Sequence, residues 1–389
     1  MTHPSLSERA AFLAQRPRNR MSALAAKYQD VIGLSRGDPD LPTPPHIVEA
    51  AYRAARDGQT HYTPTLGIVP LREAISAKLR RENGVDYGAD EVMITSGGQE
   101  AICVVMQSIL NPGDEVILPS PTYTSYVLAA QLAGGVPVQV PLNRDQGFQL
   151  DLAEVERRIT PRTKAIVVVS PNNPTGTVLS REALEGVADM ARRHNLLVIS
   201  DEIYEKILFD GATHHSIASF PEMQPRTIIV NGFSKAYSMT GWRVGWVAAP
   251  QAVMKGMQVV KDVHSICTSA PDQHAGLAAL TGPQDCLEET LSIYARRRMW
   301  LLSGIHAANL PTTPHGGSVF VFADVRGRDL TSEQFCIRLL EEERVTTSPG
   351  TDFGANGEGF VRITLLAPDP RFREAVDRLA RFARHTHPG

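Results

Sequence analysis

The sequence lacks the marks of several large classes of protein. Its cysteines, Cys103, Cys267, Cys286 and Cys336, lie far apart and form no CxxC pair, which argues against a zinc cluster and against the disulfide framework of a small secreted domain. No apolar run approaches the roughly 18–20 residues of a membrane helix, and the N-terminal stretch lacks the apolar core of a signal peptide. We therefore expect a cytoplasmic protein with no metal centre and no membrane partner.

An excess of charge of one sign is also absent. The 389 residues carry a net charge of −3, with 42% hydrophobic and 21% charged residues, which is ordinary for a globular protein. This balance provides no global basic surface for a nucleic acid. The sequence contains neither a G-x-G-x-x-G fingerprint nor a Walker A loop, so dinucleotide and nucleoside-triphosphate sites lose support.

What the chain does contain is a series of short apolar runs separated by stretches with helical character. Runs that are apolar at consecutive positions fit strands buried on both faces. Asp151 and Ser180 are placed to cap two of the intervening helices. Alternation of strands and helices predicts a mostly parallel α/β sheet, with strands at 92–95, 116–119, 165–169, 196–200, 227–230 and 244–249.

Nearer the C-terminus the pattern changes. Helices are predicted at 286–308 and 370–384, and strands at 318–325 and 359–366. The stretch 1–40 reads as helix followed by a proline-rich passage. We predict a large domain at 45–285 and a smaller α+β domain that combines 1–44 with 286–389. A chain of this length is compatible with such a division.

Polar residues follow several of the predicted strands. Ligands of parallel sheets bind beyond the carboxyl ends of the strands, and the segments found there are "SGGQEA", "SPNNPTG", "DEIY" and "NGFSK". Each residue has an ordinary explanation when it is taken alone. Asn173 is typical of a turn and Asp201 of a helix cap, while Lys235 and Arg243 are typical of a solvated surface.

Taken together, the same residues form one consistent set. Lys235 offers an amine that reacts with aldehydes, Asp201 offers a carboxylate and Asn173 offers an amide donor. Tyr204 adds a phenol, and the glycine turn with a serine and Arg243 adds an anion site. Pyridoxal 5′-phosphate has an aldehyde, a protonatable ring nitrogen, a phenolic oxygen and a phosphate. The set therefore predicts a site for this cofactor.

The chain resembles the class I/II aspartate aminotransferase family of fold-type I pyridoxal-phosphate enzymes. The resemblance rests on the order and spacing of "LSRGDPDLPTP", "YTPTLGIVPLREAI", "SPNNPTG", "SDEIY", "SKAYSMTGWRVG" and "GEGFVRITL", and it covers almost the whole chain. It implies an α/β fold with a three-layer, mostly parallel sheet in the large domain. It also implies a ping-pong aminotransferase that moves an amino group from an L-amino acid to a 2-oxo acid through a Lys235 aldimine.

The resemblance further implies a role for individual residues. Lys235 corresponds to the catalytic lysine that holds the aldehyde, and Asp201 to the partner of the ring nitrogen. Asn173 and Tyr204 correspond to the donors to the phenolic oxygen, and Tyr123 to the aromatic residue stacked on the ring. The remaining assignments are Gly98, Gln99, Ser234 and Arg243 around the phosphate, Arg362 and the backbone at Gly37 on the substrate carboxylate, and Tyr62 on the phosphate of the neighbouring subunit of a homodimer.

The amino donor stays open, with acidic and aromatic amino acids as the two candidates. Gln99 stands where several relatives place a lysine, and no certain cation for an acidic side chain is evident. Arg18 and Arg20 either reach such a side chain or lie solvated on an arm. A β-eliminating lyase or another Cα-chemistry enzyme of the same fold is the main alternative. A cofactor-binding transcription regulator and a nicotinamide dehydrogenase are more remote.

Overall fold

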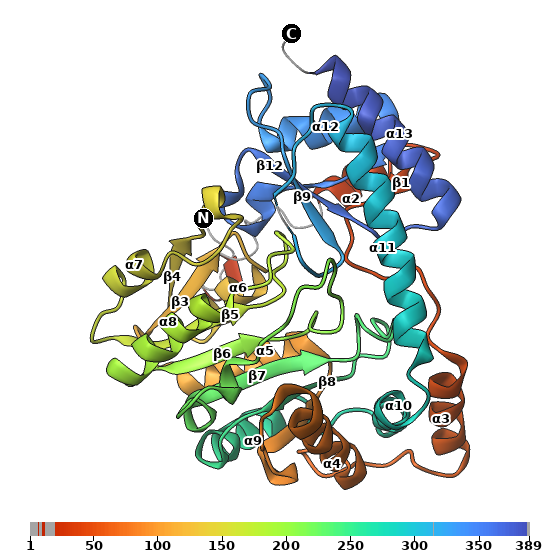
Figure 1. Cartoon of the computed structure of the whole chain (residues 1–389). Coiled ribbons are helices and arrows are strands. Elements are labelled where there is room, and N and C mark those ends of the chain that lie inside the picture. Colours follow the sequence, from red (N-terminus) through yellow and green to blue (C-terminus); the bar gives the residue numbers. More distant parts are fainter. Residues whose placement is uncertain (1–6, 8–9, 12–19, 314, 387–389) are drawn as a thin grey trace.

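The computed structural model describes residues 7, 10–11, 20–313 and 315–386. Arg18 and the side chain of Arg20, for which a role near the substrate was left open, lie outside the described atoms. Figure 1 shows a large lower part built around one sheet and a smaller upper part that contains the C-terminal helix. The predicted division into domains at 45–285 and at 1–44 with 286–389 stays a prediction.

A seven-stranded sheet of order β2-β8-β7-β6-β5-β3-β4 forms the centre of the lower part. Strand β8 runs antiparallel to both of its neighbours, and all other neighbours pair in parallel. The mostly parallel α/β sheet is therefore confirmed. Its strands are β2 (Val92–Thr95), β3 (Glu115–Ser120), β4 (Val136–Pro141), β5 (Thr163–Val169), β6 (Leu197–Asp201), β7 (Thr227–Gly232) and β8 (Gly245–Ala248).

Side chains that alternate along β5 belong to two separate hydrophobic clusters. Val167 and Val169 pack with one cluster, and Ile166 and Val168 pack with the other. Successive side chains of a strand point to opposite faces of the sheet, so both faces are covered and the fold has three layers. This explains why the strand sequences are apolar at consecutive positions.

Strand β4 was missing from the predicted strands. It pairs only with β3 at the edge of the sheet, and most of its residues are exposed or half-buried. Pro137 and Pro141 lie within it, and a proline, which has no N–H to donate, is tolerated at an edge. Because of the prolines and the weak apolar pattern, the sequence did not predict this strand.

Helices pack on both faces of the sheet and around the upper part (Figure 1). The predicted caps at Asp151 and Ser180 are confirmed, because their side chains accept from the backbone N–H of Glu154 and Ala183 at 3.0 and 3.1 Å. The helices are α2 (Arg20–Ala25), α3 (Pro45–Arg56), α4 (Val69–Lys78), α5 (Gly98–Ile109), α6 (Ser125–Leu132), α7 (Leu152–Arg157), α8 (Arg181–Arg193), α9 (Gln251–Ser265), α10 (Ala270–Thr281), α11 (Asp285–His306), α12 (Ser332–Glu343) and α13 (Asp369–His385).

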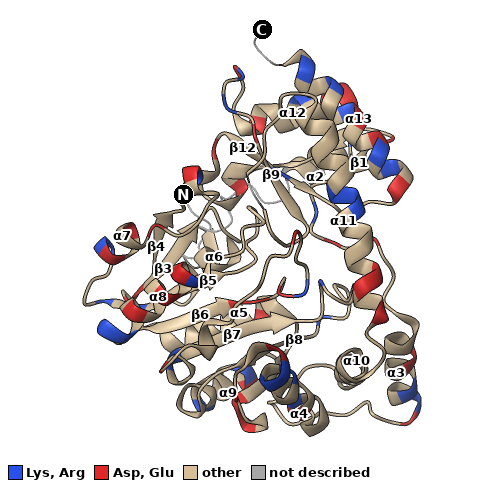
Figure 2. Cartoon of the chain, viewed as in Figure 1, with Lys and Arg blue, Asp and Glu red and all other residues tan. Residues whose placement is uncertain are grey.

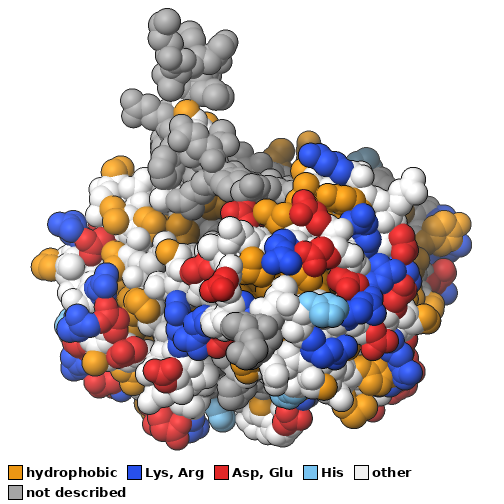
Figure 3. All heavy atoms as spheres, turned by 90° about the horizontal axis from the view of Figure 1, so that it is seen from above, with side chains coloured by type: hydrophobic (Ala, Val, Ile, Leu, Met, Phe, Trp, Pro, Cys, Tyr) orange, Lys and Arg blue, Asp and Glu red, His pale blue; other side chains and the backbone are white. Residues whose placement is uncertain are grey.

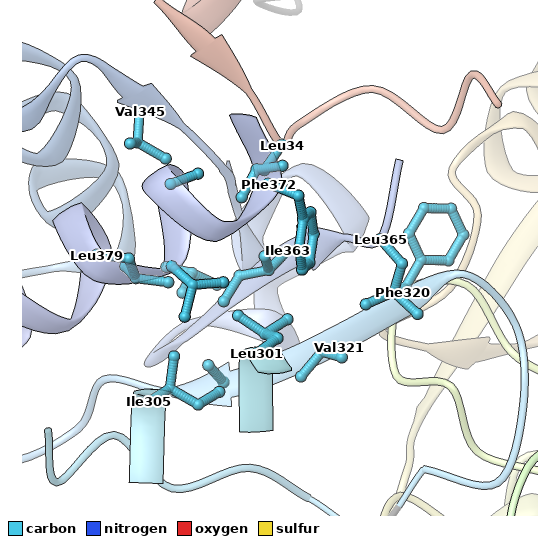
Figure 4. Packing of buried hydrophobic residues seen from close by; sticks show 14 of the residues in the cluster. Leu34, Leu301, Ile305, Phe320, Val321, Val345, Ile363, Leu365, Phe372 and Leu379 are labelled. Atoms are coloured by element: carbon cyan, nitrogen blue, oxygen red, sulfur yellow. The ribbon is translucent and has the colours of Figure 1, made fainter. Parts of the chain in front are cut away.

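The upper part contains a three-stranded antiparallel sheet of order β11-β12-β9 and a short parallel pair, β1 with β10. Helices α11, α12 and α13 bury one continuous apolar cluster against these strands. Figure 4 shows Phe320 at one end of this cluster, beside Leu365. The strands are β1 (Ile32–Gly33), β9 (Phe320–Asp324), β10 (Val345–Thr346), β11 (Ser348–Pro349) and β12 (Phe360–Thr364).

Most charged residues lie on the helices and loops, and few lie on the strands of the central sheet (Figure 2). On the described part of the face shown in Figure 3, Lys and Arg side chains are interspersed with Asp and Glu. Among the described helices, none is both long and apolar enough to cross a membrane.

Arg297 on α11 links three segments of the upper part. Its Nη1 and Nη2 donate to the two carboxylate oxygens of Asp40 at 2.7 and 2.9 Å, and its Nε donates to Asp369 at 2.8 Å. A further bond from Nη1 reaches the carbonyl oxygen of Leu365 at 3.0 Å. The side chain is only 2% exposed, so this buried cation fixes the segment that contains residue 40 to α11 and α13.

We expect Arg297→Ala to lower the free energy of unfolding by about 3 kcal/mol, because removing one member of a buried ion pair leaves the charge of Asp40 uncompensated. Arg296→Ala is the matched control. Arg296 also pairs with Asp369, at 2.7 Å, but it is 41% exposed, and exposed pairs contribute about 1 kcal/mol or less. Urea unfolding followed by tryptophan fluorescence measures both variants. Equal losses in the two would contradict the anchoring role.

Candidate active site

A cavity of about 530 Å³ opens at the carboxyl ends of the central strands. Residues from the seven-stranded sheet, from the three-stranded sheet and from the segment before α3 line it. Every site residue predicted from the sequence lines the cavity except Tyr62. Those that do are Gly37, Gly98, Gln99, Tyr123, Asn173, Asp201, Tyr204, Ser234, Lys235, Arg243 and Arg362.

Lys235 lies just beyond β7, and its Nζ donates to the carbonyl oxygen of Gly37 at 2.5 Å. Burial is the main reason that the pKa of Lys235 is lowered to about 8. The positive charges of Arg362 and Arg243 lower it as well, whereas the carboxylate of Asp38 opposes the shift. About one tenth of the amine is therefore neutral and nucleophilic at pH 7, far more than for an ordinary lysine.

Asp201 is the last residue of β6 and is almost fully buried. Its Oδ2 accepts from the Tyr126 hydroxyl at 2.8 Å and its Oδ1 from the backbone N–H of Ile203 at 3.1 Å. Burial raises its pKa to about 6 in spite of these two bonds. No described cation pairs with this carboxylate. The site therefore fits a cationic ligand group, such as the protonated ring nitrogen of pyridoxal 5′-phosphate.

Arg362 on β12 is buried between the aromatic rings of Phe320 and Phe353, at 4.3 and 4.5 Å from their centroids. Its Nη1 donates to Asn173 Oδ1 at 2.9 Å, and its Nη2 donates to the carbonyl oxygen of Ser35. Its Nε is buried without a hydrogen-bond partner in the described structure. Because burial lowers the pKa of Arg362 to about 10 and donor capacity remains, the group fits an anionic ligand.

Asn173 and Tyr204 contribute the neutral donors. Since the amide oxygen of Asn173 accepts from Arg362, the amide NH₂ is left for a ligand. The Tyr204 ring packs edge-on against Phe320, with the centroids 5.6 Å apart. Its hydroxyl bonds to none of the described residues, and burial raises its pKa. Both donors fit a ligand oxygen.

An anion cradle is formed where β2 turns into α5. Gly97 has φ +79° at the N-cap, and a Cβ there would lie 2.6 Å from Arg243 Nη2, so only glycine allows this approach. A Cβ added at Gly98 would meet open space. Arg243 itself has φ +55°, a conformation that non-glycine residues rarely adopt. Helix N-termini and a cation together favour a phosphate here.

Tyr123 and Gln99 form the wall next to this cradle, with the Tyr123 hydroxyl donating to Gln99 Oε1 at 3.2 Å. Ser234, the last predicted residue of the cradle, is buried directly before Lys235. These positions fit the predicted contacts with a ring and a phosphate. The roles of the individual residues stay predictions.

Several residues of the site were not singled out from the sequence. Tyr126 binds Asp201 from α6, although it stands only three residues after Tyr123 in "SPTYTSY". Arg36 and Asp38 line the cavity on either side of Gly37, and Asp38 Oδ1 accepts from the Thr240 hydroxyl at 2.5 Å. The "SRGD" segment gave a signal, since it places two charged residues around the predicted glycine.

Tyr62 lies outside the cavity and is 80% exposed. Tyr62 therefore does not line the site of its own chain, and its predicted contact with a phosphate stays a prediction. This position is compatible with the predicted contact to a neighbouring subunit.

A second group of titratable residues lies in the segment that follows β6, outside the cavity. Glu202, Glu205 and His214 approach one another closely enough to surround a cation. The ammonium of Lys78 already contacts Glu205 and also donates to Asn83 Oδ1 at 2.7 Å. This lysine compensates the negative charge of Glu205, so we interpret the cluster as a buried ion-pair network.

The sequence matches the family described as aminotransferase class I and II over residues 29–379. It is similar to an aspartate aminotransferase of Pyrococcus abyssi, with 38% identity over 383 residues that cover 98% of this chain and 98% of the relative. It is equally similar to aromatic-amino-acid aminotransferase 2 of Thermococcus litoralis, with 38% identity over 378 residues, 96% of this chain and 97% of the relative.

Solved structures show the same relationship. The aspartate aminotransferase of Thermus thermophilus with maleate has a TM-score of 0.92 and 39% identity, covering 98% of this chain and 100% of that chain. An aromatic aminotransferase from Pyrococcus horikoshii has a TM-score of 0.89 and 40% identity, covering 93% and 98%. The predicted family and its fold are confirmed.

The lowered pKa of Lys235 predicts how its reactivity depends on pH. In the cofactor-free protein, the rate at which an aldehyde labels Lys235 should rise with pH and reach half of its maximum at about pH 8. The neutral amine is the reacting species, and an ordinary lysine reaches that point at about pH 10.4. Borohydride trapping and peptide mass spectrometry between pH 6 and 11 measure the rate. Exposed Lys255 is the internal control, and coinciding profiles would contradict the shift.

Proposed function

The chain belongs to the class I and II aminotransferases, and we propose that it moves an amino group from an L-amino acid to a 2-oxo acid with pyridoxal 5′-phosphate bound at Lys235. One observation carries the choice of cofactor. A lysine whose pKa is lowered to about 8 and a buried carboxylate without a described cationic partner line the same cavity. An amine and a carboxylate in these states fit an aldehyde and a protonated ring nitrogen.

The remaining polar groups of the cavity would hold the cofactor in one orientation. Gly98, Ser234 and Arg243 surround the position for a phosphate, and Tyr123 would lie against the ring. The Asn173 amide and the Tyr204 hydroxyl would donate to the phenolic oxygen. When bound, pyridoxal 5′-phosphate supplies an aldehyde for the substrate amine and a ring that accepts the electron pair of the broken C–H bond.

Arg362 would bind the substrate's α-carboxylate, for which it has a free Nε and a charge held in place by two aromatic rings. A substrate anchored there presents its Cα to Lys235. The Nζ of Lys235, once the substrate amine has replaced it at the aldehyde, would take the proton from Cα as a general base and would return it to the carbon of the cofactor's aldehyde group. Asp201 keeps the opposite end of the site negative, which favours a proton on the ring nitrogen.

The second substrate, a 2-oxo acid, would use the same contacts in the reverse direction. Its carboxylate is equivalent to that of the amino acid, so Arg362 serves both half-reactions. One set of side chains therefore binds donor and acceptor in turn, which is the basis of the proposed ping-pong order.

Loading the purified chain with pyridoxal 5′-phosphate tests the proposal. We expect borohydride to fix the cofactor's mass on Lys235, and an L-amino acid alone to shift the cofactor's absorbance while releasing one equivalent of 2-oxo acid. Lys235→Ala should still take up the cofactor but lose turnover by about 10²–10⁴-fold, the usual contribution of a positioned base. Pyruvate and ammonia formed continuously without an oxo acid would indicate a lyase instead, and full activity of the variant would overturn the assignment.

We also propose a homodimer in which Tyr62 reaches the phosphate bound to the partner subunit. The support is the position of Tyr62, which is 80% exposed and lies outside its own chain's cavity. Exposed apolar residues on α9, Val259 and Val263, offer further surface for a second copy.

Mixed dimers test whether Tyr62 acts across subunits. Co-expression of Lys235→Ala with Tyr62→Ala chains should give one intact site per mixed dimer, and therefore roughly half of wild-type activity at limiting cofactor. The Tyr62→Ala homodimer, in which both sites lack the tyrosine, is the control. It should require a higher cofactor concentration to reach half of its maximal activity. A mixed dimer that requires as much cofactor as this control would show that Tyr62 acts within its own chain.

A further inference from the structure

The cavity contains more cationic side chains than the proposed chemistry uses. Lys235, Arg243 and Arg362 have assigned partners in an aldehyde, a phosphate and an α-carboxylate. Arg36 lines the same cavity and has no assigned partner. The family relationship leaves the amino donor open, because relatives at 38% identity are named for aspartate and for aromatic amino acids.

Arg36 also lacks a polar partner among the described residues. Among the described residues, none forms a hydrogen bond, an ion pair or a ring contact with its side chain, which is exposed. The nearest acidic residue in sequence, Asp38, accepts instead from the hydroxyl of Thr240 at 2.5 Å. An arginine that lines a cavity and has no partner among the described residues keeps its guanidinium donors available for a ligand.

The backbone on both sides of Arg36 fixes its position in the site. The carbonyl oxygen of Ser35 accepts from Arg362 Nη2, and that of Gly37 accepts from Lys235 Nζ at 2.5 Å. Residue 36 thus stands between the cation that would hold the substrate's α-carboxylate and the amine that would act on its Cα. A side chain that leaves Cα toward the solvent passes within reach of an arginine placed there.

We infer that Arg36 binds a second carboxylate, on the side chain of the substrate, and thereby selects dicarboxylic amino acids and 2-oxo acids. This inference rests on the proposed function. A planar guanidinium matches a carboxylate as a two-pronged donor.

Other anionic partners fit this position less well. The phosphate has its own cradle at Gly97, Gly98 and Arg243, at the turn from β2 to α5. Arg36 belongs instead to the segment held by Arg362 and Lys235, on the substrate side. Gln99, which lies on the cradle side, is uncharged and cannot replace the cation.

Matched pairs of substrates isolate the effect of Arg36. Aspartate with asparagine, and glutamate with glutamine, differ in side-chain charge and little in size. In the cofactor-loaded enzyme, we expect Arg36→Gln to lower kcat/KM for the two acids by about 10- to 100-fold, mostly through KM. The two amides should change by less than about 3-fold, since the lost contact involves a charge. Arg36→Lys should retain part of the preference.

Binding of unreactive acids provides a second readout. Calorimetry should show that Arg36→Gln raises the Kd for succinate by about 10-fold or more and leaves the Kd for butyrate nearly unchanged. Arg181→Gln, an exposed arginine on α8 that pairs with Glu185, is the control and should match the wild type. Cofactor absorbance equal to that of the wild type verifies that each variant is folded.

The outcomes separate this inference from the proposed function. If the wild type converts amino acids but Arg36→Gln affects acids and amides equally, the assignment of Arg36 is wrong and the aminotransferase chemistry stands. The same holds if the wild type shows no preference for the acids. If no amino acid shifts the absorbance of the wild type and no cofactor is trapped on Lys235, both are overturned.

Discussion

Two hydrogen bonds to one short stretch of backbone determine the shape of the site. The carbonyl oxygens of Ser35 and Gly37 accept from Arg362 on β12 and from Lys235 after β7. Arg362 belongs to the three-stranded sheet and Lys235 to the loop that follows β7, so the stretch lies between them on one side of the cavity. Arg297 holds the continuation of the same segment through Asp40. The N-terminal segment is therefore part of the site, although most of the cavity wall is formed much later in the chain.

Burial is the largest contribution to the electrostatics of the cavity, and it acts on opposite charges in opposite directions. Burial disfavours the charged form of any group, so it lowers the pKa of Lys235 to about 8 and raises that of Asp201 to about 6. The pKa of each group thereby lies nearer to 7, so at neutral pH each group gains or loses a proton at a small cost in free energy. A ligand that carries a cation for Asp201 and accepts the amine of Lys235 relieves both penalties together. The protein thus stores in its folded state part of the free energy that favours such a ligand.

The fold followed from sequence where burial produced a simple pattern. A strand buried on both faces, such as β5, is apolar at consecutive positions from Ala165 to Val169. Asp151 and Ser180 were recognisable as caps because they bond to the first turn of their helices. Edge strand β4 was missed because half-exposure and prolines erase that pattern. Residues directly after strands were found by the strand-end rule and by resemblance. Tyr126 and Arg36 were not, since Tyr126 reaches Asp201 across the sheet from α6 and Arg36 is placed by contacts of its neighbours' backbone with residues about 200 and 330 positions away.

This use of backbone atoms has a consequence for specificity. Lys235 and Arg362 contact carbonyl oxygens, which every residue provides, so the contacts on both sides of position 36 do not depend on which side chain is present there. Asp38 is likewise engaged by Thr240 and not by Arg36. A change of side chain at position 36 therefore alters the outer end of the cavity without moving the groups that perform proton transfer. The proposed chemistry belongs to the buried end of the cavity, where Asp201 is held by Tyr126 and Asn173 by Arg362. In our inference, selection of the substrate belongs to the exposed end, where the side chain of Arg36 bonds to none of the described residues.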